Sequence, residues 1–364
     1  MYIKNLQLNN FRNYENESFE FSDGINILSG DNAQGKTNCA EAIFYLCTGY
    51  STRATRDKQV ISYGKDNAQI EGTAVSRYGN VNVKMEFFKN ESKSVKINGA
   101  PVAKIGELLG NINSVFFNPG ELKLIQESPE DRRRFMDIAL SQTNRSYFYS
   151  LQRYRKILNQ RNNLLKEEDD NLVYSTLEVW DRQLASAAAE IIECRNLFIK
   201  QLQPFATAAH EFITDGKENL TVKGEDDYAG ERADIEKKLI EELSVRVEKD
   251  RILGYTTVGP HRDDLKIKVN GEDVKNYGSQ GQQRTAALSL KLAELEIFKQ
   301  TQGEYPVLIL DDAMSELDKN RQKRLLEKVN GVQTIITCTH VDEEVFSGTE
   351  YKSFIINSGN IKRN

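Results

Sequence analysis

The sequence is poor in the residues that build disulfide frameworks and zinc sites. Its 364 residues include four cysteines, three histidines and one tryptophan. The cysteines, at positions 39, 47, 194 and 338, are scattered and form no C-x-x-C pair, and the histidines show no metal-ligand spacing. A disulfide-stapled or zinc-binding fold is therefore not expected, and the cysteine usage fits a reducing cytosol.

Long apolar runs and a strong excess of charge are also missing. No run approaches the length of a membrane span, and the first five residues lack the apolar core of a signal peptide. Lysine and arginine number 49 against 54 aspartates and glutamates, a net charge of −5, so bulk charge does not mark a basic nucleic-acid binder. We expect a cytoplasmic globular protein of about two domains with no membrane contact.

A glycine-rich stretch near the start matches a phosphate-binding loop of the form G-x-x-x-x-G-K-[ST]. The matching residues are Gly30, Asp31, Asn32, Ala33, Gln34, Gly35, Lys36 and Thr37. A strand is expected over 25–28 and a helix over 38–46, an order that points a helix N-terminus at an anion. Backbone N–H groups would surround phosphates, with Lys36 on the terminal phosphates and Thr37 on Mg²⁺. A chance glycine turn is the alternative, and the full match favours a nucleotide site.

A second motif of the same kind lies near the other end of the chain. The apolar run 307–310 predicts a buried strand that ends in Asp311 and Asp312 and delivers a carboxylate to the same metal. If both motifs belong to one nucleotide site, the long segment between them must leave the domain and return.

The middle of the chain is predicted to be helical and locally basic. Within 128–250, apolar residues over 177–202 recur at steps of three and four, which predicts a helix about 39 Å long at roughly 1.5 Å per residue. A second helix over 151–165 would pack against it as a short arm. Basic residues with interleaved aromatics precede this hairpin and could hold nucleic-acid phosphates, although a solvated helix face explains them equally well. The basic residues of 131–161 are Arg132, Arg133, Arg134, Arg145, Arg153, Arg155, Lys156 and Arg161.

Strand patterns flank this helical segment on both sides. Residues 1–115 alternate in polarity and include the turn pair Asn98-Gly99, and the alternating run 265–269 leads into Asn270-Gly271. Next, 277–284 opens a helix predicted over 285–293, where small residues expose free N–H groups. Alone, that helix start could be no more than a cap.

These residues resemble the ABC-type ATPases. Ser279, Gln280, Gly281 and Gln282 are similar to the signature motif, 315–318 to the D-loop, and His340 to the switch histidine. A head of this kind split by a helical arm resembles the SMC-like ATPases, and within them the RecF family. That narrower resemblance is carried by 8–14, 30–38, 128–137, 259–264 and 277–282, and it spans the whole chain in order.

The resemblance implies a fold and a set of roles. The fold would be an α/β ABC-type P-loop ATPase head, with a mixed sheet and an antiparallel β lobe, over 1–127 and 251–364, and with a helical arm inserted over 128–250. The cofactors would be ATP and Mg²⁺, with Thr37 and Asp311 on the metal. Catalysis would involve Lys36, Asp311, Asp312 and His340, and the nucleotide would also meet Asn38, Arg12 and Asn13. Ser279, Gln280, Gly281, Gln282 and Asp318 would contact the nucleotide bound to a second copy.

The implied activity is ATP-gated dimerisation on DNA. Asp312 stands where most ABC ATPases have glutamate, so slow hydrolysis is expected. Arg132, Arg133, Arg134, Arg153, Arg155 and Lys156 are the candidate DNA contacts, made without regard to base sequence to single- or double-stranded DNA. The resemblance also implies partner mediator proteins that help load a recombinase at gapped DNA.

The sequence departs from the family at one segment and leaves other classes open. Gly120 and Glu121 stand where acidic residues are usual, and no glutamine can be assigned to the Q-loop. A transporter's nucleotide-binding subunit would share the motifs, but with a shorter separation and no basic arm. Another SMC-like DNA-repair ATPase, of the nuclease-associated kind, would need far longer coiled coils than 147–202 supplies. A small-molecule kinase or GTPase would not need the Ser279 helix start.

Overall fold

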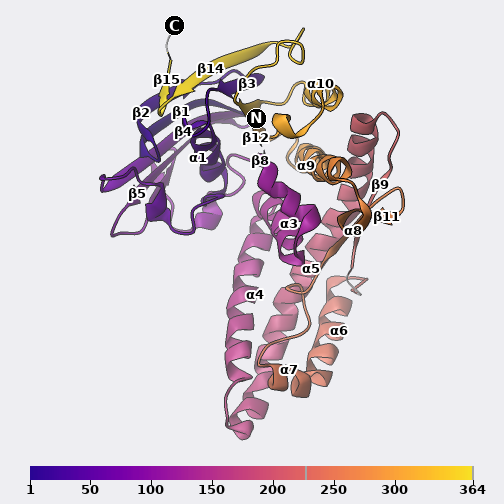
Figure 1. The fold of residues 1–364 in the computed structure, drawn as a ribbon. Coiled ribbons are helices and arrows are strands. Elements are labelled where there is room, and N and C mark those ends of the chain that lie inside the picture. Colours follow the sequence, from indigo (N-terminus) through magenta and orange to yellow (C-terminus); the bar gives the residue numbers. More distant parts are fainter. Residues whose placement is uncertain (226–227, 363–364) are drawn as a thin grey trace.

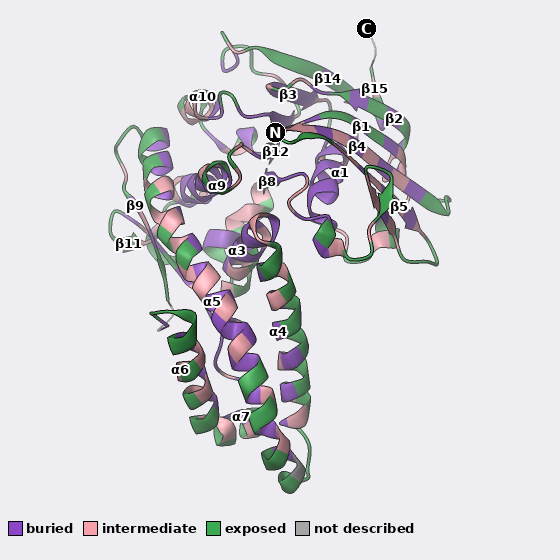
Figure 2. Cartoon of the chain, turned by 180° about the vertical axis from the view of Figure 1, so that it is seen from behind, coloured by how far each residue is buried: buried purple, intermediate pink, exposed green. Residues whose placement is uncertain are grey.

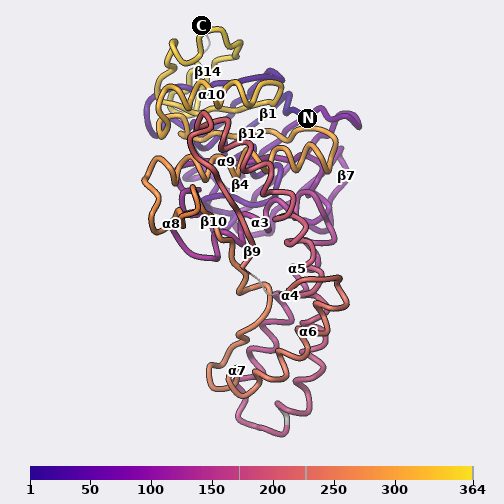
Figure 3. The backbone as a smooth tube through the Cα atoms, turned by 90° about the vertical axis from the view of Figure 1, so that its right-hand side faces the viewer, coloured from indigo at the N-terminus to yellow at the C-terminus, as the bar shows by residue number. Residues whose placement is uncertain are grey.

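The chain folds into a broad head with a long helical arm (Figure 1). The computed structural model describes residues 1–225 and 228–362. Both described ends of the chain lie in the head, and the arm extends away from it, as the view turned by 90° also shows (Figure 3). Within the described ranges, no helix is both long and apolar enough to cross a membrane.

A mixed six-stranded sheet forms the centre of the head. Its parallel pairs join β14 to β3, β3 to β13, β13 to β12 and β12 to β8, and β15 closes one edge antiparallel to β14. In sheet order the strands are β15 (Asn360–Ile361), β14 (Tyr351–Asn357), β3 (Ile25–Ser29), β13 (Thr334–Cys338), β12 (Val307–Asp311) and β8 (Ser114–Phe117).

An antiparallel lobe covers one side of this sheet, with helix α1 (Lys36–Thr48) between the two. The turn pair Asn98-Gly99 has φ of 50° and 81° and closes the last hairpin, as its sequence predicted. The lobe's strands, in sheet order, are β2 (Tyr14–Glu20), β1 (Tyr2–Phe11), β4 (Asn67–Ser76), β5 (Gly79–Phe88), β6 (Ser94–Ile97) and β7 (Ala100–Pro101). The mixed sheet and the antiparallel lobe confirm the predicted α/β architecture.

The central sheet separates two apolar cores. On β12, Val307 and Ile309 join the core of α1 and the lobe, whereas Leu308 and Leu310 join the core of the helices on the other face. The alternation follows from the strand period of two. Both α1 and α9 (Gln280–Gln302) are coloured as largely buried in Figure 2. Nucleotide loop and signature segment therefore belong to different cores.

Helices make up the arm and its attachment to the head. The short strands β9 (Leu220–Gly224), β10 (Leu265–Val269) and β11 (Glu272–Asp273) form a third sheet beside α9. The remaining α-helices are α2 (Lys123–Gln126), α3 (Pro129–Thr143), α4 (Arg145–Leu164), α5 (Asp170–Thr214), α6 (Arg232–Val245), α7 (Val247–Leu253), α8 (Val274–Tyr277) and α10 (Lys319–Lys328). Short 3₁₀ turns occur at η1 (Asp57–Val60), η2 (Ile105–Glu107), η3 (Pro119–Leu122) and η4 (Met314–Glu316).

Helix α5 is much longer than the sequence pattern predicted. It has 45 residues, about 68 Å at roughly 1.5 Å per residue, against the expected 177–202. The predicted seam continues through Leu202, Ala206, Ala209 and Ile213, and this last part packs in the core that contains α9. The helix thus runs from the arm into the head, and one continuous core crosses the boundaries predicted at 128 and 250.

A fully buried guanidinium joins three helical segments in the outer arm. Arg161 on α4 donates to Asp181 on α5 at 2.6 Å and to Asp250 on α7 at 2.8 Å. Arg161 and Asp250 are 0% exposed. Because a buried charge without its partner is costly, this pair fixes how the helices pack.

We expect Asp250→Ala to reduce the free energy of unfolding of the arm by about 3–5 kcal/mol, since it leaves Arg161 buried with one carboxylate fewer. Urea unfolding followed by far-UV circular dichroism measures this. The matched control is Arg182→Ala, which removes an exposed pair with Glu178 on α5 and should cost less than about 1 kcal/mol. Equal unfolding midpoints for the two variants would contradict the assignment.

Candidate nucleotide site

The glycine-rich loop lies between β3 and α1, as predicted. Gly30 and Gly35 have φ of 145° and 121°, a region that favours glycine, and a Cβ on Gly30 would lie 2.3 Å from the carbonyl oxygen of Ile356. The buried Lys36 donates from Nζ to the carbonyls of Gly30 at 2.6 Å and Asp31 at 2.7 Å. The loop therefore wraps around the Lys36 ammonium group at the start of a helix.

The two distant motifs meet at one edge of the central sheet. Strands β3, β13 and β12 are parallel neighbours, so their carboxyl ends share an edge. Thr37 Oγ1 donates to Asp311 Oδ1 at 2.9 Å across 274 positions of sequence. The chain does leave and return to complete the site, as the separation of the motifs suggested.

Thr337, which the sequence reasoning missed, supports both acidic residues. Its hydroxyl donates to Asp311 Oδ1 at 2.7 Å and accepts from the Asp312 N–H at 3.0 Å. Burial raises the pKa of Asp311, while the hydrogen bonds from Thr337 and Thr37 act in the opposite direction. Only the position of Thr337 at the end of the predicted strand 334–338 could have signalled this role.

Asp312 and His340 follow β12 and β13 at the same edge. Asp312 is exposed, has φ of 55°, and accepts a hydrogen bond from Ser315 Oγ to its carbonyl at 2.8 Å. His340 is also exposed, two residues beyond the end of β13. Both side chains are thus accessible from outside the head, although Asp312 Oδ1 also accepts from Ser315 Oγ at 3.3 Å.

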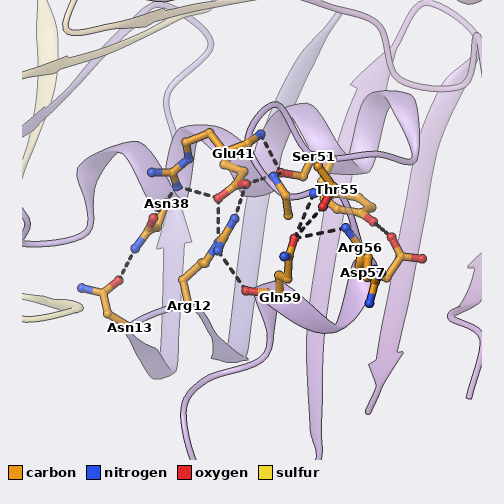
Figure 4. A network of polar contacts seen from close by, with 12 residues as sticks. Arg12, Asn13, Asn38, Glu41, Ser51, Thr55, Arg56, Asp57 and Gln59 are labelled. Atoms are coloured by element: carbon orange, nitrogen blue, oxygen red, sulfur yellow. Dashed lines mark hydrogen bonds and ion pairs between the residues drawn. The ribbon is translucent and has the colours of Figure 1, made fainter. Parts of the chain in front are cut away.

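A polar network links the first strand to the phosphate loop (Figure 4). Asn13 Nδ2 donates to the carbonyl of Gln34 at 2.8 Å, and Asn38 donates to Asn13 Oδ1 at 2.7 Å. Arg12 donates twice to Glu41, at 3.0 and 2.7 Å. Asn13 therefore contacts the loop and Arg12 contacts the helix that follows it, and the reach of both residues to the nucleotide stays a prediction.

Glu41 is the centre of that network and was not predicted. It is fully buried on α1, and its Oε2 also accepts a hydrogen bond from the Arg53 guanidinium at 2.6 Å. Burial alone would raise the pKa of Glu41, but hydrogen bonds from Arg12 and Ser51 and the charge of Arg53 hold this pKa below its usual value. Position 41 lies opposite the apolar positions 39, 42, 43 and 46 of the predicted helix, so the sequence pattern gave no signal of this burial.

A further polar residue follows the edge strand β8 at the same end of the sheet. The parallel register pairs Phe117 of β8 with Leu310 of β12, so Asn118 follows β8 next to Asp311. No glutamine of the sequence could be assigned to the Q-loop, and Asn118 is the residue that follows β8 at this edge.

The residues of this edge fit a Mg²⁺-nucleotide. Backbone N–H groups and Lys36 suit phosphates, and Thr37 and Asp311 offer oxygen donors, which Mg²⁺ prefers. Among the described residues, no group of three or more histidines, cysteines, aspartates or glutamates could hold a metal alone.

The signature segment lies elsewhere in the head. Ser279 caps α9: its Oγ accepts from Gln282 N–H at 3.2 Å, while Gln282 Oε1 accepts from Ser279 N–H at 2.9 Å. In Figure 1, the neighbouring α8 and the phosphate-loop helix α1 lie on opposite sides of the head. Asp318, in the D-loop-like run, caps α10 by accepting from Arg321 N–H at 3.0 Å. The phosphate loop and the signature segment thus occupy separate places in one chain.

A chain of contacts ties the signature segment to the end of α5. Gln282 Nε2 donates to Glu218 Oε1 at 3.0 Å, and Glu218 Oε2 contacts His210 Nε2 at 3.2 Å. His210 is fully buried, and its Nδ1 lies 3.1 Å from Ser289 Oγ on α9. Glu218 therefore holds the side chain that caps the signature helix.

The predicted DNA-contacting residues separate into two groups. The prediction for Arg132 was wrong: it is 5% exposed, and its guanidinium bonds to both carboxylate oxygens of Asp264, at 2.5 and 2.8 Å. Arg133 is half-buried and donates to the Asp263 carbonyl at 2.7 Å. The exposed members are Arg134, Arg153, Arg155 and Lys156.

A phosphate loop, a carboxylate at the end of a parallel strand of the same sheet and a separate capped helix start define an ABC-type ATPase head with an inserted arm. The family model described as RecF/RecN/SMC N terminal domain matches residues 2–357. The chain belongs to the RecF family: it is 46% identical over 351 residues to the DNA replication and repair protein RecF of Ruminiclostridium cellulolyticum, with 93% of each chain covered.

Solved structures agree with this assignment. A structure of the recombination mediator protein RecF-ATP in the RecFOR pathway is 36% identical, with a TM-score of 0.90 over 100% of this chain and 97% of that one. An Smc head bound to the C-winged helix domain of ScpA is 16% identical, with a TM-score of 0.59 over 100% of this chain and 96% of that one. The latter likeness supports the fold, and the predicted ABC-type head is confirmed.

We expect Thr337→Val to weaken Mg²⁺-dependent ATP binding at acidic pH. The substitution removes a hydrogen bond that lowers the pKa of Asp311, so this pKa rises and the carboxylate is protonated at higher pH. Affinity should then be lost at a pH higher by on the order of one unit. Titration of a fluorescent ATP analogue across acidic to neutral pH measures it. Thr337→Ser keeps the hydroxyl and should lose affinity at the same pH as the wild type. If Thr337→Val also loses affinity at the wild-type pH, Thr337 does not set the pKa of Asp311.

Proposed function

We propose that this chain is an ATP-dependent, DNA-binding recombination mediator whose ATP-bound form is a homodimer. Mg²⁺-dependent hydrolysis, slow because Asp312 replaces the usual glutamate, would reset it. The protein would act in the cytoplasm at gapped or single-stranded/double-stranded DNA, with partner mediator proteins, to help load a recombinase. The names of its relatives, a DNA replication and repair protein and a recombination mediator, support this role.

The observation that carries the dimer is the separation of the half-sites. In Figure 1 the phosphate-loop helix α1 and helix α8, which precedes the Ser279 helix start, lie on opposite sides of the head, and we infer that neither motif encloses a nucleotide within the chain. Two copies related by twofold symmetry bring each loop against the other copy's helix start. ATP then binds the dimer better than the monomer, and this difference in affinity shifts the equilibrium.

We expect ATP to convert the wild type from monomer to dimer, measured by size exclusion with light scattering. Lys36→Ala should stay monomeric because its side chain can no longer bind the phosphates. Glu218→Ala should bind ATP as the wild-type monomer does but dimerise about fivefold or more weakly, since Gln282 loses its charged acceptor.

Glu218→Gln is the conservative control, because its amide oxygen still accepts from Gln282. A wild type that stays monomeric with saturating ATP at high protein concentration would overturn the dimer. Dimerisation of Glu218→Ala at wild-type strength would overturn only the role of Glu218.

The DNA surface would be the exposed cations of α4 and α3. Arg153 and Lys156 lie one turn apart on α4 and are exposed. Contacts of this kind neutralise backbone phosphates and carry no sequence information. DNA held between two arms would follow from a dimer of such heads.

We expect duplex affinity to fall linearly with salt on logarithmic axes, and Arg153→Ala/Lys156→Ala to make this slope shallower by about two, since each neutralised phosphate contributes about 0.9. Fluorescence anisotropy at several salt concentrations measures this. Lys237→Ala/Lys249→Ala, on α6 and α7, removes the same charge elsewhere on the arm and should leave the slope unchanged. If the two double variants change the salt slope equally, α4 is not part of the DNA-binding surface.

A further inference from the structure

A cavity of about 820 Å³ lies at the base of the arm, apart from the nucleotide site. We call it the arm-base cavity. Helices α3 and α4, the end of α1 and the segment around Pro260 line it, and the phosphate-loop residues 30–37 do not. Its volume falls within the range of small-ligand sites.

Positive charge dominates the lining. Five cationic side chains face two carboxylates, Glu130 and Asp137. Asp137 is already neutralised, because it accepts from Arg195 at 2.8 Å and from Arg155 at 3.3 Å. His261 adds no charge at neutral pH, since burial lowers its pKa to about 4.

Two of these cations remain available to an anion. Arg134 is exposed and makes no hydrogen bond or ion pair with any residue of 1–225 and 228–362 in this structure. Arg133 has one backbone acceptor, the Asp263 carbonyl, and burial and the neighbouring Arg195 lower its pKa. An anion would stabilise both guanidinium groups, which suit the paired oxygens of a phosphate.

The rest of the cavity wall is apolar and includes aromatic rings. Tyr50, Ile138, Phe148 and Leu151 line the cavity beside these cations. Aromatic faces stack on nucleic-acid bases without regard to sequence. A phosphate-binding pair of arginines next to such a wall matches a nucleoside phosphate better than an inorganic anion.

We propose that the arm-base cavity is a second nucleotide-sized site, which takes a nucleoside phosphate with the phosphate on Arg134 and Arg133 and the base against Phe148. The ligand is an unpaired nucleotide of a DNA strand or a free nucleotide. Exposed Arg153 and Lys156 continue from Arg155 along α4, which favours a strand that leads into the cavity. In that form the inference rests on the proposed DNA-binding function and places the single-stranded part of the DNA.

The test uses the full-length chain without ATP and four probes: labelled dT12, an abasic strand of the same length, a blunt duplex, and dTMP. Arg134→Ala should weaken binding of dT12 and of the abasic strand about tenfold, the value of one charged hydrogen bond. Phe148→Leu should weaken dT12 alone, because the abasic strand has no base to stack. Arg182→Ala on α5 is the control with equal charge change.

The four probes distinguish a DNA strand from a free nucleotide as the ligand. Arg134-dependent binding of dTMP, measured in the Lys36→Ala background to remove the phosphate loop, would indicate a free nucleotide. Dependence for the strand alone would indicate DNA. Unchanged binding of dT12 and dTMP by Arg134→Ala would overturn the cavity as a site. Wild-type protein that binds neither strand nor duplex would instead refute the DNA function, and the dTMP arm would still decide the cavity.

Discussion

The rest of the fold depends on one constraint: the phosphate loop and Asp311 must lie side by side, as the hydrogen bond between Thr37 and Asp311 shows. The phosphate loop and the Asp311 carboxylate both stand at the carboxyl ends of parallel strands, in the order β3-β13-β12. Strand β8, from whose end the chain departs to form the arm, lies beside β12, to which the chain returns through α9. Both ends of the arm excursion are therefore anchored on adjacent strands of the nucleotide edge.

Buried ion pairs then fix the arm to this base. Arg195 of α5 donates to Asp137 of α3 and, also at 2.8 Å, to Asp263, while Arg132 of α3 holds Asp264. All of these residues except Arg195 belong to the segments 128–137 and 259–264, which carried much of the family resemblance. Their chemistry explains why: such pairs are costly to break once buried, so they specify one packing of α3, α5 and the returning chain. Arg132, which the sequence predicted to contact DNA, is therefore part of a buried contact between α3 and the returning chain.

The sequence predicted those features that depend on local pattern. The phosphate loop, the strands 307–310 and 334–338 and both Asn-Gly turns follow from residue period and turn chemistry, and the structure has them. The burial of Arg132 could not be predicted, because it depends on Asp264, a partner 132 positions away. Glu41 and Thr337 were missed for the same reason: each acts through residues that only the tertiary fold brings near. The length of α5 was underestimated, since its second half packs on the head rather than in a helical hairpin.

The division into two cores gives the proposed dimer a mechanical consequence. Helix α1 and the antiparallel lobe share one core, whereas α9, α5 and the arm share the other. Glu218 and His210 tie the signature segment to α5, which continues unbroken into the arm. A nucleotide shared between two copies would join the first core of one to the second core of its partner. Because each arm is continuous with the second core, closing the two nucleotide sites would also fix the angle between the arms, and DNA held between them would favour the same closed state.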